Sequence, residues 1–411
     1  MITFAKDTID NIDINELCDW LRLCPKLTKG EETLAFEHEW SEWLGVKHSV
    51  FVNSGSSANF MMFLVLRHLL AELHSKSLNF TQRYKVVIPA VSWITSVSPA
   101  LLLNYDVILC DCDENDLGLD VNAFEQLCAE HNPDAVLVVH VLGHPNKMDR
   151  IVDICKQHDV LLLEDCCESH GAQWNGQTVG TFGVMSSFSY YFGHHISTIE
   201  GGMICTNALN VNDLLLMYRS HGWLRDVGNM YRDQVLKHWN IDEFDALYTF
   251  AVPGMNLRST DLQAYLGRLQ MKKLDRSVNN RNDVYKKLCV RLRKTNAWIQ
   301  TSNNSFVSSL AFGLITAQRE LIVKALQDAN IECRPLICGN IQNHPFWNTF
   351  GSKRWHTPYA DIVHKYGFYI PCHQELTAFE IDSMCTIIEK FVKCSNENVD
   401  VCMLDAVCVV D

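Results

Sequence analysis

The chain has 411 residues, of which 47% are hydrophobic and 20% are charged, so it is long enough for two domains with large cores. Its 35 Lys and Arg residues against 48 Asp and Glu residues give a formal charge of −13, and no local basic patch offsets it. Because such a surface repels phosphate backbones, nucleic-acid binding is not expected. A small anionic ligand is compatible with this charge, since a few local donors can hold it.

The 17 cysteines are scattered from Cys18 to Cys408, and no secretory hydrophobic segment follows Met1. This pattern favours reduced thiols in a cytoplasmic protein. The longest apolar run, residues 60–73, is interrupted by charged and polar residues and is too short for a spanning helix. We therefore expect a soluble protein without membrane contact.

The first two-thirds of the chain alternates short β-rich runs with helical patterns. The predicted strands are residues 86–88, 106–109, 135–139 and 160–163, and the predicted helices are residues 56–73, 121–131 and 148–158. Continuous apolar strands that alternate with helices predict a largely parallel sheet covered on both faces. Ligands of such sheets bind beyond the carboxyl ends of the strands, so the polar residues that follow the strands are candidates for a site.

Beyond Leu257 a long helical pattern continues to about Leu292. The shorter elements expected after it are strands at 306–314 and 331–336 and helices near 320–329 and 379–392. This order predicts a smaller α+β domain joined by a long helix. We place a large domain at residues 1–272 and a small domain at 273–411, with the N-terminal segment allowed to pack against the small one. Residues 396–411 show no helical period and are interpreted as an appendage of unknown role.

The first polar motif is residues 53–58, Asn-Ser-Gly-Ser-Ser-Ala, which precedes a predicted helix. Hydroxyl groups and free amides at a helix N-terminus make an anion-binding site. The alternative is a serine that caps the helix and binds no ligand.

The second motif, Leu-Glu-Asp-Cys-Cys-Glu-Ser-His-Gly at residues 163–171, begins at the end of a predicted strand. Asp165 is expected at the carboxyl end of that strand, with Glu168 shortly after it. One carboxylate could keep a ring nitrogen protonated while the second contacts another edge of the ligand. A magnesium site and a solvent-facing acidic pair are the alternatives.

The third motif spans residues 187–202, Ser-Phe-Ser-Tyr-Tyr-Phe-Gly-His-His-Ile-Ser-Thr-Ile-Glu-Gly-Gly. We interpret it as too irregular for a helix and too polar for a core strand, and its Glu-Gly-Gly indicates a special backbone conformation. Adjacent histidine side chains diverge, and no regular His, Cys or carboxylate spacing accompanies them, so no metal site is predicted.

Six motifs occur in one order: Gly-Ser-Ser near residue 55, Trp93 after a strand, Glu-Asp-x-x-Glu-Ser-His-Gly at 164–171, Ser-x-Tyr from 189, Glu-Gly-Gly at 200–202 and Gly-x-Asn-x-Arg at 254–258. Over roughly residues 28–395, this order resembles the vitamin-B6-dependent sugar aminotransferases and dehydratases that act on nucleotide-linked keto-sugars. The resemblance implies an α/β fold of the aspartate-aminotransferase type (fold type I), with a mostly parallel sheet in the large domain.

The resemblance implies pyridoxal 5′-phosphate or pyridoxamine 5′-phosphate as the cofactor. Asp165 would pair with the pyridine nitrogen and Trp93 would stack on the ring, whereas a core aromatic is the alternative for Trp93. Glu168 would be a cofactor contact near the 3-hydroxyl. The serines implied to hold the phosphate are Ser56, Ser57 and Ser189.

Asn256 matches an asparagine that reaches the phosphate of the neighbouring subunit, which implies a homodimer with shared active sites. Basic residues in matching positions are candidates for substrate or carboxylate contacts, although exposed basic residues are often ordinary surface. These candidates are His221, Arg258 and Arg334.

The departure from the family is at His194, where the aminotransferases carry the lysine that forms a Schiff base with the cofactor. No lysine lies between Lys156 and Lys237. An imidazole cannot form that bond, but its reference pKa of ~6.5 suits it to move protons near neutral pH. A histidine here resembles the 3-dehydratases that make 3,6-dideoxysugars, and His194 is therefore the predicted catalytic residue.

Two branches of these 3-dehydratases are relevant. One acts on CDP-4-keto-6-deoxyglucose with a [2Fe–2S] cluster, and the other acts on GDP-4-keto-6-deoxy-D-mannose without a cluster, in colitose biosynthesis. The first branch places three cluster cysteines after the histidine motif. Here no cysteine lies between Cys205 and Cys289, and Cys167 alone cannot hold a cluster. The GDP-sugar branch without iron is therefore favoured.

The resulting expectation is C3 dehydration of a nucleotide-linked 4-keto-6-deoxy sugar, with L-glutamate converting the cofactor to its pyridoxamine form and ammonia released. The alternatives are the CDP-sugar dehydrase, an inactive homologue that only binds the cofactor, and an aminotransferase that uses a distant lysine. Retention of Asp165, Trp93 and the phosphate serines argues against an inactive homologue.

Overall fold

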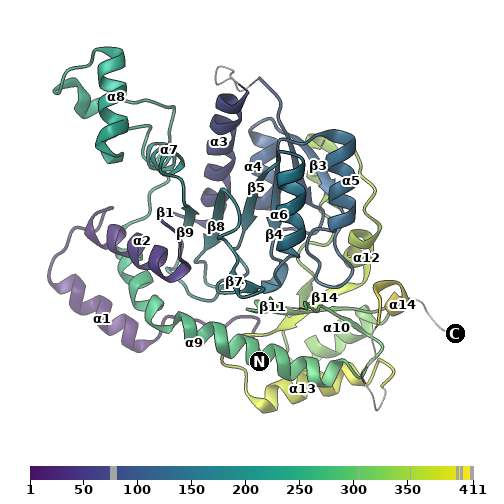
Figure 1. The fold of residues 1–411 in the computed structure, drawn as a ribbon. Coiled ribbons are helices and arrows are strands. Elements are labelled where there is room, and N and C mark those ends of the chain that lie inside the picture. The colour runs from purple at the N-terminus through teal and green to yellow at the C-terminus, as the bar shows by residue number, and fades with distance from the viewer. Residues whose placement is uncertain (75–80, 304, 352, 395–397, 399–400, 408–411) are drawn as a thin grey trace.

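The computed structural model describes residues 1–74, 81–303, 305–351, 353–394, 398 and 401–407, and a seven-stranded sheet lies at its centre (Figure 1). The strand order is β1-β9-β8-β5-β4-β2-β3, and the five strands from β8 to β3 are parallel. β9 runs antiparallel to both β8 and β1. The strands are β1 His48–Val52, β2 Lys85–Pro89, β3 Asp106–Cys110, β4 Ala135–Val139, β5 Leu161–Asp165, β8 Met185–Ser189 and β9 Gly202–Thr206.

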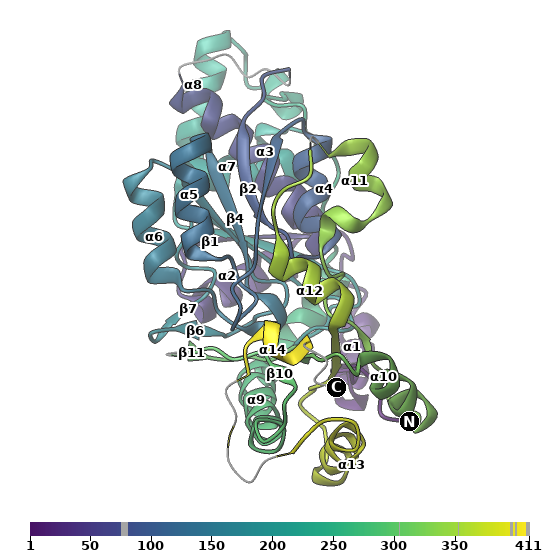
Figure 2. The same cartoon turned by 90° about the vertical axis from the view of Figure 1, so that its right-hand side faces the viewer.

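Helices cover both faces of this sheet, and successive residues of the strands alternate between them (Figure 2). Leu137 packs toward α3 and α4, whereas Val136 and Val138 pack toward α5 and α6. Both faces of the central strands are therefore buried, which explains their continuous apolar sequences. The helices of these layers are α3 Gly55–Leu73, α4 Ile94–Leu102 and α7 Leu209–Arg219 on one side, and α5 Val121–His131 and α6 Met148–Gln157 on the other.

A smaller antiparallel sheet, in the order β10-β12-β14-β13, lies beside the long helix α9, Asp261–Leu292. Its strands are β10 Trp298–Ile299, β12 Ala311–Ile315, β13 Arg334–Pro335 and β14 Gly367–Pro371. A separate apolar core joins this sheet to α9 and to α10 Arg319–Asp328 and α13 Ala378–Glu389. The N-terminal segment also reaches this region, because Ile2 pairs with Ile331. The division of the chain at residue 272 stays a prediction.

The remaining elements are short or peripheral. They are α1 Asn11–Arg22, α2 Glu31–Leu44, α8 Asn229–Trp239, α11 Pro345–Phe350, α12 Pro358–Tyr366 and α14 Met403–Val407, the 3-10 turns η1 Val141–Gly143, η2 Leu224–Asp226, η3 Asp245–Tyr248 and η4 Ile341–Asn343, and the small sheet of β11 Ser305–Phe306, β6 Gln173–Trp174 and β7 Gln177–Thr178. Among the described helices, none is long and apolar enough to cross a bilayer.

The α/β fold with a mostly parallel sheet is as predicted, and the four strands and three helices predicted in the first part of the chain are present within two residues at each end. The strand predicted at 306–314 is wrong: β11 and β12 are separate. The backbone between them bonds to η1 instead, with Ser308 N donating to the carbonyl of Gly143 and Leu310 N to that of Leu142.

Two further expectations need correction. The start of the third motif was expected to be too polar for a core strand, but it forms β8, which is buried over its whole length. Burial is tolerated because the serine hydroxyls are hydrogen-bonded, as Ser187 is to Asn59 at 2.6 Å. The strand predicted at 331–336 is reduced to Arg334–Pro335. The C-terminal appendage includes α14, in which Met403 is fully buried, while 395–397, 399–400 and 408–411 lie outside the described residues.

A buried ion pair joins α7 to α2 beside the strand β1. The Arg219 guanidinium donates to Glu37 and to the carbonyl of Phe51, and Arg219 is fully buried. The Glu37 carboxylate also accepts the Phe51 N–H at 2.8 Å. Removal of the arginine would leave this carboxylate buried without its counterion.

We expect Arg219→Met to lower the free energy of unfolding by about 3–5 kcal/mol, because one partner of a buried pair stays behind uncompensated. Chemical denaturation measures this change. The exposed pair of Arg22 with Asp19 supplies the control, since Arg22→Met should cost about 1 kcal/mol or less. Equal losses in the two variants would contradict this account of the pair.

Candidate active site

A cavity of about 360 Å³ lies at the carboxyl ends of the central strands. The turn before α3, the start of α4, the segment after β5 and the segment after β8 all contribute to it, together with β13 and β14 of the four-stranded sheet. Its polar and aromatic lining includes Ser54, Ser56, Trp93, Ser96, Asp165, Glu168, Ser189, Tyr191, His194, Glu200, Arg334, Tyr369 and Phe4. Three separate sequence motifs therefore meet in one place.

The turn before α3 carries the helix N-terminus into this cavity. Ser54 caps the helix, and its Oγ accepts the Ser57 N–H at 3.1 Å. A Cβ atom on Gly55 would come within 2.5 Å of the Ser189 Cβ atom. Glycine at this position therefore lets the turn approach β8 and leaves backbone N–H groups and hydroxyls available to an anion.

The glycines of the Glu-Gly-Gly sequence were expected to adopt a special backbone conformation, but the structure shows that they allow close packing. Neither Gly201 nor Gly202 has a positive φ, whereas Ile199 does, at 71°. A Cβ atom on Gly202 would collide with the backbone of Ser54. The motif therefore serves close packing of β9 against the turn before α3, and the backbone strain lies at Ile199.

Asp165 is the last residue of β5, is 4% exposed, and its carboxylate is held by three donors. Asn59 of α3 donates to Oδ2 at 2.8 Å, and Ser96 of α4 donates to the same oxygen at 2.7 Å. The Cys167 N–H donates to Oδ1 at 3.1 Å. These contacts fix the carboxylate at the cavity floor.

Glu164, the neighbour of Asp165, points to the other side of the strand. Its carboxylate accepts three backbone N–H groups, from Gly180, Phe182 and Gly183, at 2.7–2.8 Å. His140 lies 3.3 Å from it. Glu164 thus organises the loop at residues 180–183 and does not line the cavity that Asp165 and Glu168 share.

His194 follows β8 in a turn closed by its own N–H, which donates to the Tyr191 carbonyl at 3.0 Å. Its Nδ1 atom is buried without a hydrogen-bond partner, so Nε2 is the nitrogen that remains available to the cavity. Burial, and secondly the positive charge of Arg281, lower the pKa of His194 to about 4. The imidazole is therefore neutral at pH 7 and ready to accept a proton.

Glu168 presents a second titratable group to the same cavity. One of its oxygens, Oε2, accepts the Leu142 N–H at 2.7 Å. Burial is the main cause that raises the pKa of Glu168 to about 7, opposed by this hydrogen bond and supported by the nearby Asp165 charge. The carboxyl group is therefore partly protonated near neutral pH.

Trp93 and Arg334 both line the cavity. Trp93 precedes α4 and is 56% exposed, which rules out the alternative of a core aromatic. The Arg334 guanidinium lies 4.2 Å from the centre of the Phe4 ring, and Phe4 N in turn donates to Glu332. The cavity therefore offers an aromatic face and a cation to a ligand.

The structure does not bring all the predicted residues into this chain's cavity. Ser57 is occupied with the Ser54 cap, and its hydroxyl lies 3.1 Å from Ser54 Oγ. His221, Asn256 and Arg258 do not line the cavity. They lie together instead, since Ser220 pairs with Asn256 and Val52 pairs with Arg258.

Sequence reasoning missed the two side chains that hold Asp165. Asn59 lies one turn after Gly55 on α3, and Ser96 follows Trp93 by three residues on α4. Their spacing from Gly55 and Trp93 in the sequence could have indicated that they face the same site. Phe4 and Tyr369 were also missed, because they enter the cavity from distant parts of the chain.

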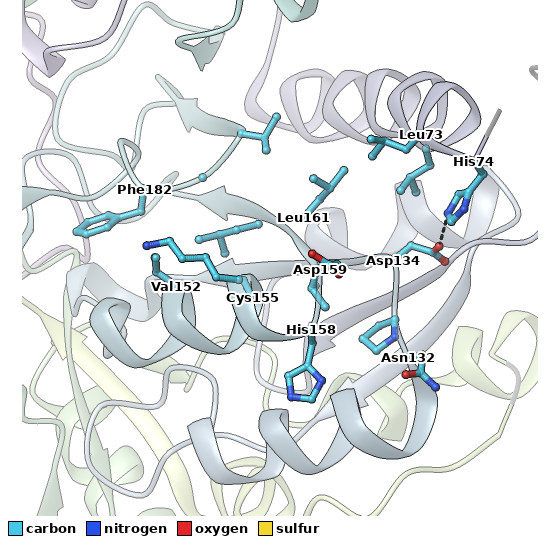
Figure 3. Close-up of a pocket in the computed structure, with 17 residues that line it drawn as sticks. Leu73, His74, Asn132, Asp134, Val152, Cys155, His158, Asp159, Leu161 and Phe182 are labelled. Atoms are coloured by element: carbon cyan, nitrogen blue, oxygen red, sulfur yellow. Dashed lines mark hydrogen bonds and ion pairs between the residues drawn. The ribbon is translucent and has the colours of Figure 1, made fainter. Parts of the chain in front are cut away.

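A larger hollow, of about 800 Å³, lies at the amino ends of the central strands β4, β5 and β8 (Figure 3). Its wall combines apolar residues such as Leu161 and Phe182 with a hydrogen bond of 3.0 Å between His74 and Asp134. None of the motif residues lines it. Size alone therefore does not identify the site, and the chemistry is gathered in the smaller cavity.

The chain belongs to the DegT/DnrJ/EryC1/StrS aminotransferase family, whose model matches residues 9–389. It is 32% identical over 374 residues to the GDP-4-keto-6-deoxy-D-mannose 3-dehydratase of Yersinia pseudotuberculosis. The aligned residues make up 88% of this chain and 92% of that protein.

Solved structures of GDP-4-keto-6-deoxymannose-3-dehydratase are also similar. One holds a trapped adduct of pyridoxal phosphate and glutamate, a geminal diamine, and has a TM-score of 0.85. The other, a histidine-to-asparagine mutant with bound GDP-perosamine, has a TM-score of 0.84. Each is 28% identical in sequence and covers 95% of this chain and 100% of its own. The aminotransferase fold is therefore established for this chain.

Glu168 gives a prediction about pH and stability. Its pKa in the folded protein, about 7, lies above its ordinary value of 4.5, so folding favours the protonated form. The stabilisation is complete below about pH 4.5 and is lost as the pH rises through 7. We expect Glu168→Gln to have a higher melting temperature than the wild type at about pH 8, and a smaller difference at about pH 5.

Thermal unfolding of the cofactor-free protein, followed by circular dichroism, measures this difference. Glu16→Gln on the exposed side of α1 is the matched control and should show no such pH dependence. A constant difference across the pH range would mean that Glu168 titrates normally.

Proposed function

We propose that this protein is a C3 dehydratase of a nucleotide-linked 4-keto-6-deoxyhexose, dependent on pyridoxal and pyridoxamine phosphate. The observation that carries the proposal is His194, which stands in the cavity where the related aminotransferases place their lysine. The substrate we favour is GDP-4-keto-6-deoxy-D-mannose, with L-glutamate as the amino donor. Similarity to dehydratases named for that sugar, at 32% identity, supports this choice.

The cavity suits such a cofactor. Asp165 offers a fixed carboxylate for the pyridinium nitrogen, and Trp93 offers an exposed aromatic face for the ring. Ser56, Ser189 and the N-terminus of α3 supply donors for the phosphate. Glu168, with one oxygen fixed by Leu142, can contact the ring's 3-hydroxyl.

When bound in its amine form, the cofactor supplies an amino group for the C4 ketone of the sugar and a pyridine ring that acts as an electron sink. His194 is assigned the proton transfers. Because the imidazole is neutral at pH 7, its Nε2 would accept a proton from the methylene carbon of the bound amine form, and the same nitrogen would return a proton to the C3 hydroxyl, which leaves as water. One residue therefore serves both as base and as acid.

The position of Arg334 on β13, in the wall of the cavity, supports a role for it in substrate binding. Its guanidinium has no carboxylate partner among the described residues and packs over Phe4. It can hold a carboxylate of glutamate or a phosphate of the nucleotide.

We also propose a homodimer in which His221, Asn256 and Arg258 serve the partner's cavity. These residues lie on this chain's surface beside the arm formed by α8, which projects away from the central sheet (Figure 1). The arm and the residues after it expose large apolar side chains, as interfaces between subunits do. These are Met230, Trp239, Phe244, Leu247, Tyr248, Phe250 and Met255. A cytoplasmic location is part of the same proposal.

The alternative substrate is CDP-4-keto-6-deoxy-D-glucose, handled by an enzyme with an iron–sulfur cluster. The cysteine-free stretch from 206 to 288 disfavours it. The two assignments differ in iron content and in the nucleotide accepted.

The function is tested by incubating the holoenzyme with L-glutamate and a panel of GDP- and CDP-linked 4-keto-6-deoxy sugars. We expect ammonia and a 4-keto-3,6-dideoxy sugar from the GDP-mannose derivative, without added iron or reductase. His194→Asn should slow this reaction by ~10²–10⁴-fold, because the proton-transfer group is lost. His356→Asn, at an exposed position, should leave the rate unchanged. Turnover of only the CDP sugar, with stoichiometric iron and sulfide, would favour the alternative.

The residue at 194 also decides how the cofactor is retained. We expect borohydride treatment of the wild type to leave the cofactor dialysable, because no lysine lies within reach in the sequence around His194. In His194→Lys the same treatment should couple the cofactor to the protein, as mass spectrometry would show. A reduced adduct on the wild-type chain would contradict the proposed site.

A further inference from the structure

Arg281 of α9 is a buried cation beside the proposed active site. It is 1% exposed, and its Nη2 donates to the carbonyl of His194 at 3.3 Å. Its Nη1 lies within hydrogen-bond distance of the carbonyls of Ser309 and Leu310, at 3.2 Å, and of Cys372, at 3.5 Å. No carboxylate pairs with it in the described part of the chain.

Another buried arginine, Arg219, has a different environment. Arg219 is equally buried, but it forms an ion pair with Glu37. A buried charge without a counterion is costly to a folded protein. Burial lowers the pKa of Arg281 to about 10, so it nevertheless stays charged at neutral pH. A neutral donor could form hydrogen bonds to the same carbonyls. Because the positive charge is not needed for these bonds, its presence indicates another role.

The same helix face anchors the whole histidine segment. Ser277, one turn before Arg281, donates to the carbonyl of His195 at 3.0 Å. His195 Nε2 lies 2.9 Å from the hydroxyl of Ser308 and 3.0 Å from its carbonyl. Residues 194–195 are thus held between α9 and the backbone that follows β11.

Three imidazoles gather beside this cation. The ring centre of His170 lies 6.1 Å from that of His194 and 4.9 Å from that of His195. Burial comes first, and Arg281 contributes, among the causes that lower the pKa of each of the three. The other titratable or charged groups in the cavity wall around His194 are Asp165, Cys167, Glu168, Tyr191, Glu200, Arg334 and Tyr369.

We propose that Arg281 is a positioning residue for the proton transfers at His194: it fixes the His194 backbone and places a positive charge, unpaired with any carboxylate of the described residues, beside this histidine. This inference rests on the proposed function of His194. The charge disfavours the imidazolium that forms once a proton is accepted. A proton taken from the methylene carbon is thereby passed on more readily to the leaving hydroxyl.

The direct test is an NMR titration of the histidine rings in the full-length holoenzyme, with the His194→Asn spectrum to assign the resonance. We expect wild-type His194 to titrate below its ordinary value of 6.5. In Arg281→Met the midpoint should rise by about one pH unit, because a like charge has been removed. In Arg281→Lys, which keeps the charge, it should stay near the wild-type value.

The control is Arg291→Met on the same helix, where the arginine is paired with Glu389 and Asp382 at the surface. It should leave the His194 midpoint unchanged. A wild-type midpoint at or above 6.5, or equal midpoints in wild type and Arg281→Met, would overturn the proposal. If Arg281→Met does not fold, Arg281→Gln takes its place, because glutamine also removes the charge but keeps an amide donor for the carbonyls, and the same rise of the midpoint is expected.

The pH dependence of kcat provides a readout that a structural role would not move. In Arg281→Met the acid limb assigned to His194 should shift to higher pH, with KM little changed. A loss of kcat that is uniform across pH would show a structural role only and would overturn the electrostatic part. Since the NMR titration needs no turnover, failure of the proposed dehydration would be distinguished from failure of this inference.

Discussion

The carboxylate of Asp165 accepts hydrogen bonds from α3, from α4 and from the backbone that follows β5, and the remaining geometry of the cavity depends on this junction. Asn59 extends it to β8, since its Oδ1 accepts the Ser187 hydroxyl. The start of α3 carries the anion-binding turn, and the start of α4 carries Trp93. A single buried carboxylate therefore sets the relative positions of the phosphate site, the aromatic wall and the strand that leads to His194.

The large sheet could be predicted because its strands are buried on both faces and carry continuous apolar sequences between helices of clear period. Prediction failed where tertiary contacts replaced local preference. Residues 307–310, Val-Ser-Ser-Leu, lie between Phe306 and the apolar β12, and their backbone groups bond to η1, so the strand is divided. In β8 the opposite occurred: its serines looked too polar for a core strand, yet Ser186 and Ser187 find buried acceptors at 2.8 and 2.6 Å.

The site was predictable in so far as its residues occur in sequence motifs that follow strands. Asp165, Glu168, Trp93 and His194 do so, and they line one cavity. Side chains that act through others leave no such trace. Arg281 lies within a regular helix pattern, 87 residues from the backbone carbonyl it holds, and nothing in its sequence neighbours marks it. The grouping of Asn256 and Arg258 away from the cavity likewise appears only once the chain is folded.

The stretch without lysine around His194 has a consequence for the protein in a cell. A cofactor held, as proposed, by Asp165, Trp93 and the phosphate donors without a covalent bond would exchange with the surrounding pool, so the loaded fraction of enzyme would follow the free vitamer concentration by mass action. The same ligand stabilises the folded chain by RT ln(1 + [L]/Kd), and nutritional depletion of the vitamin would therefore lower both catalytic output and the amount of folded protein.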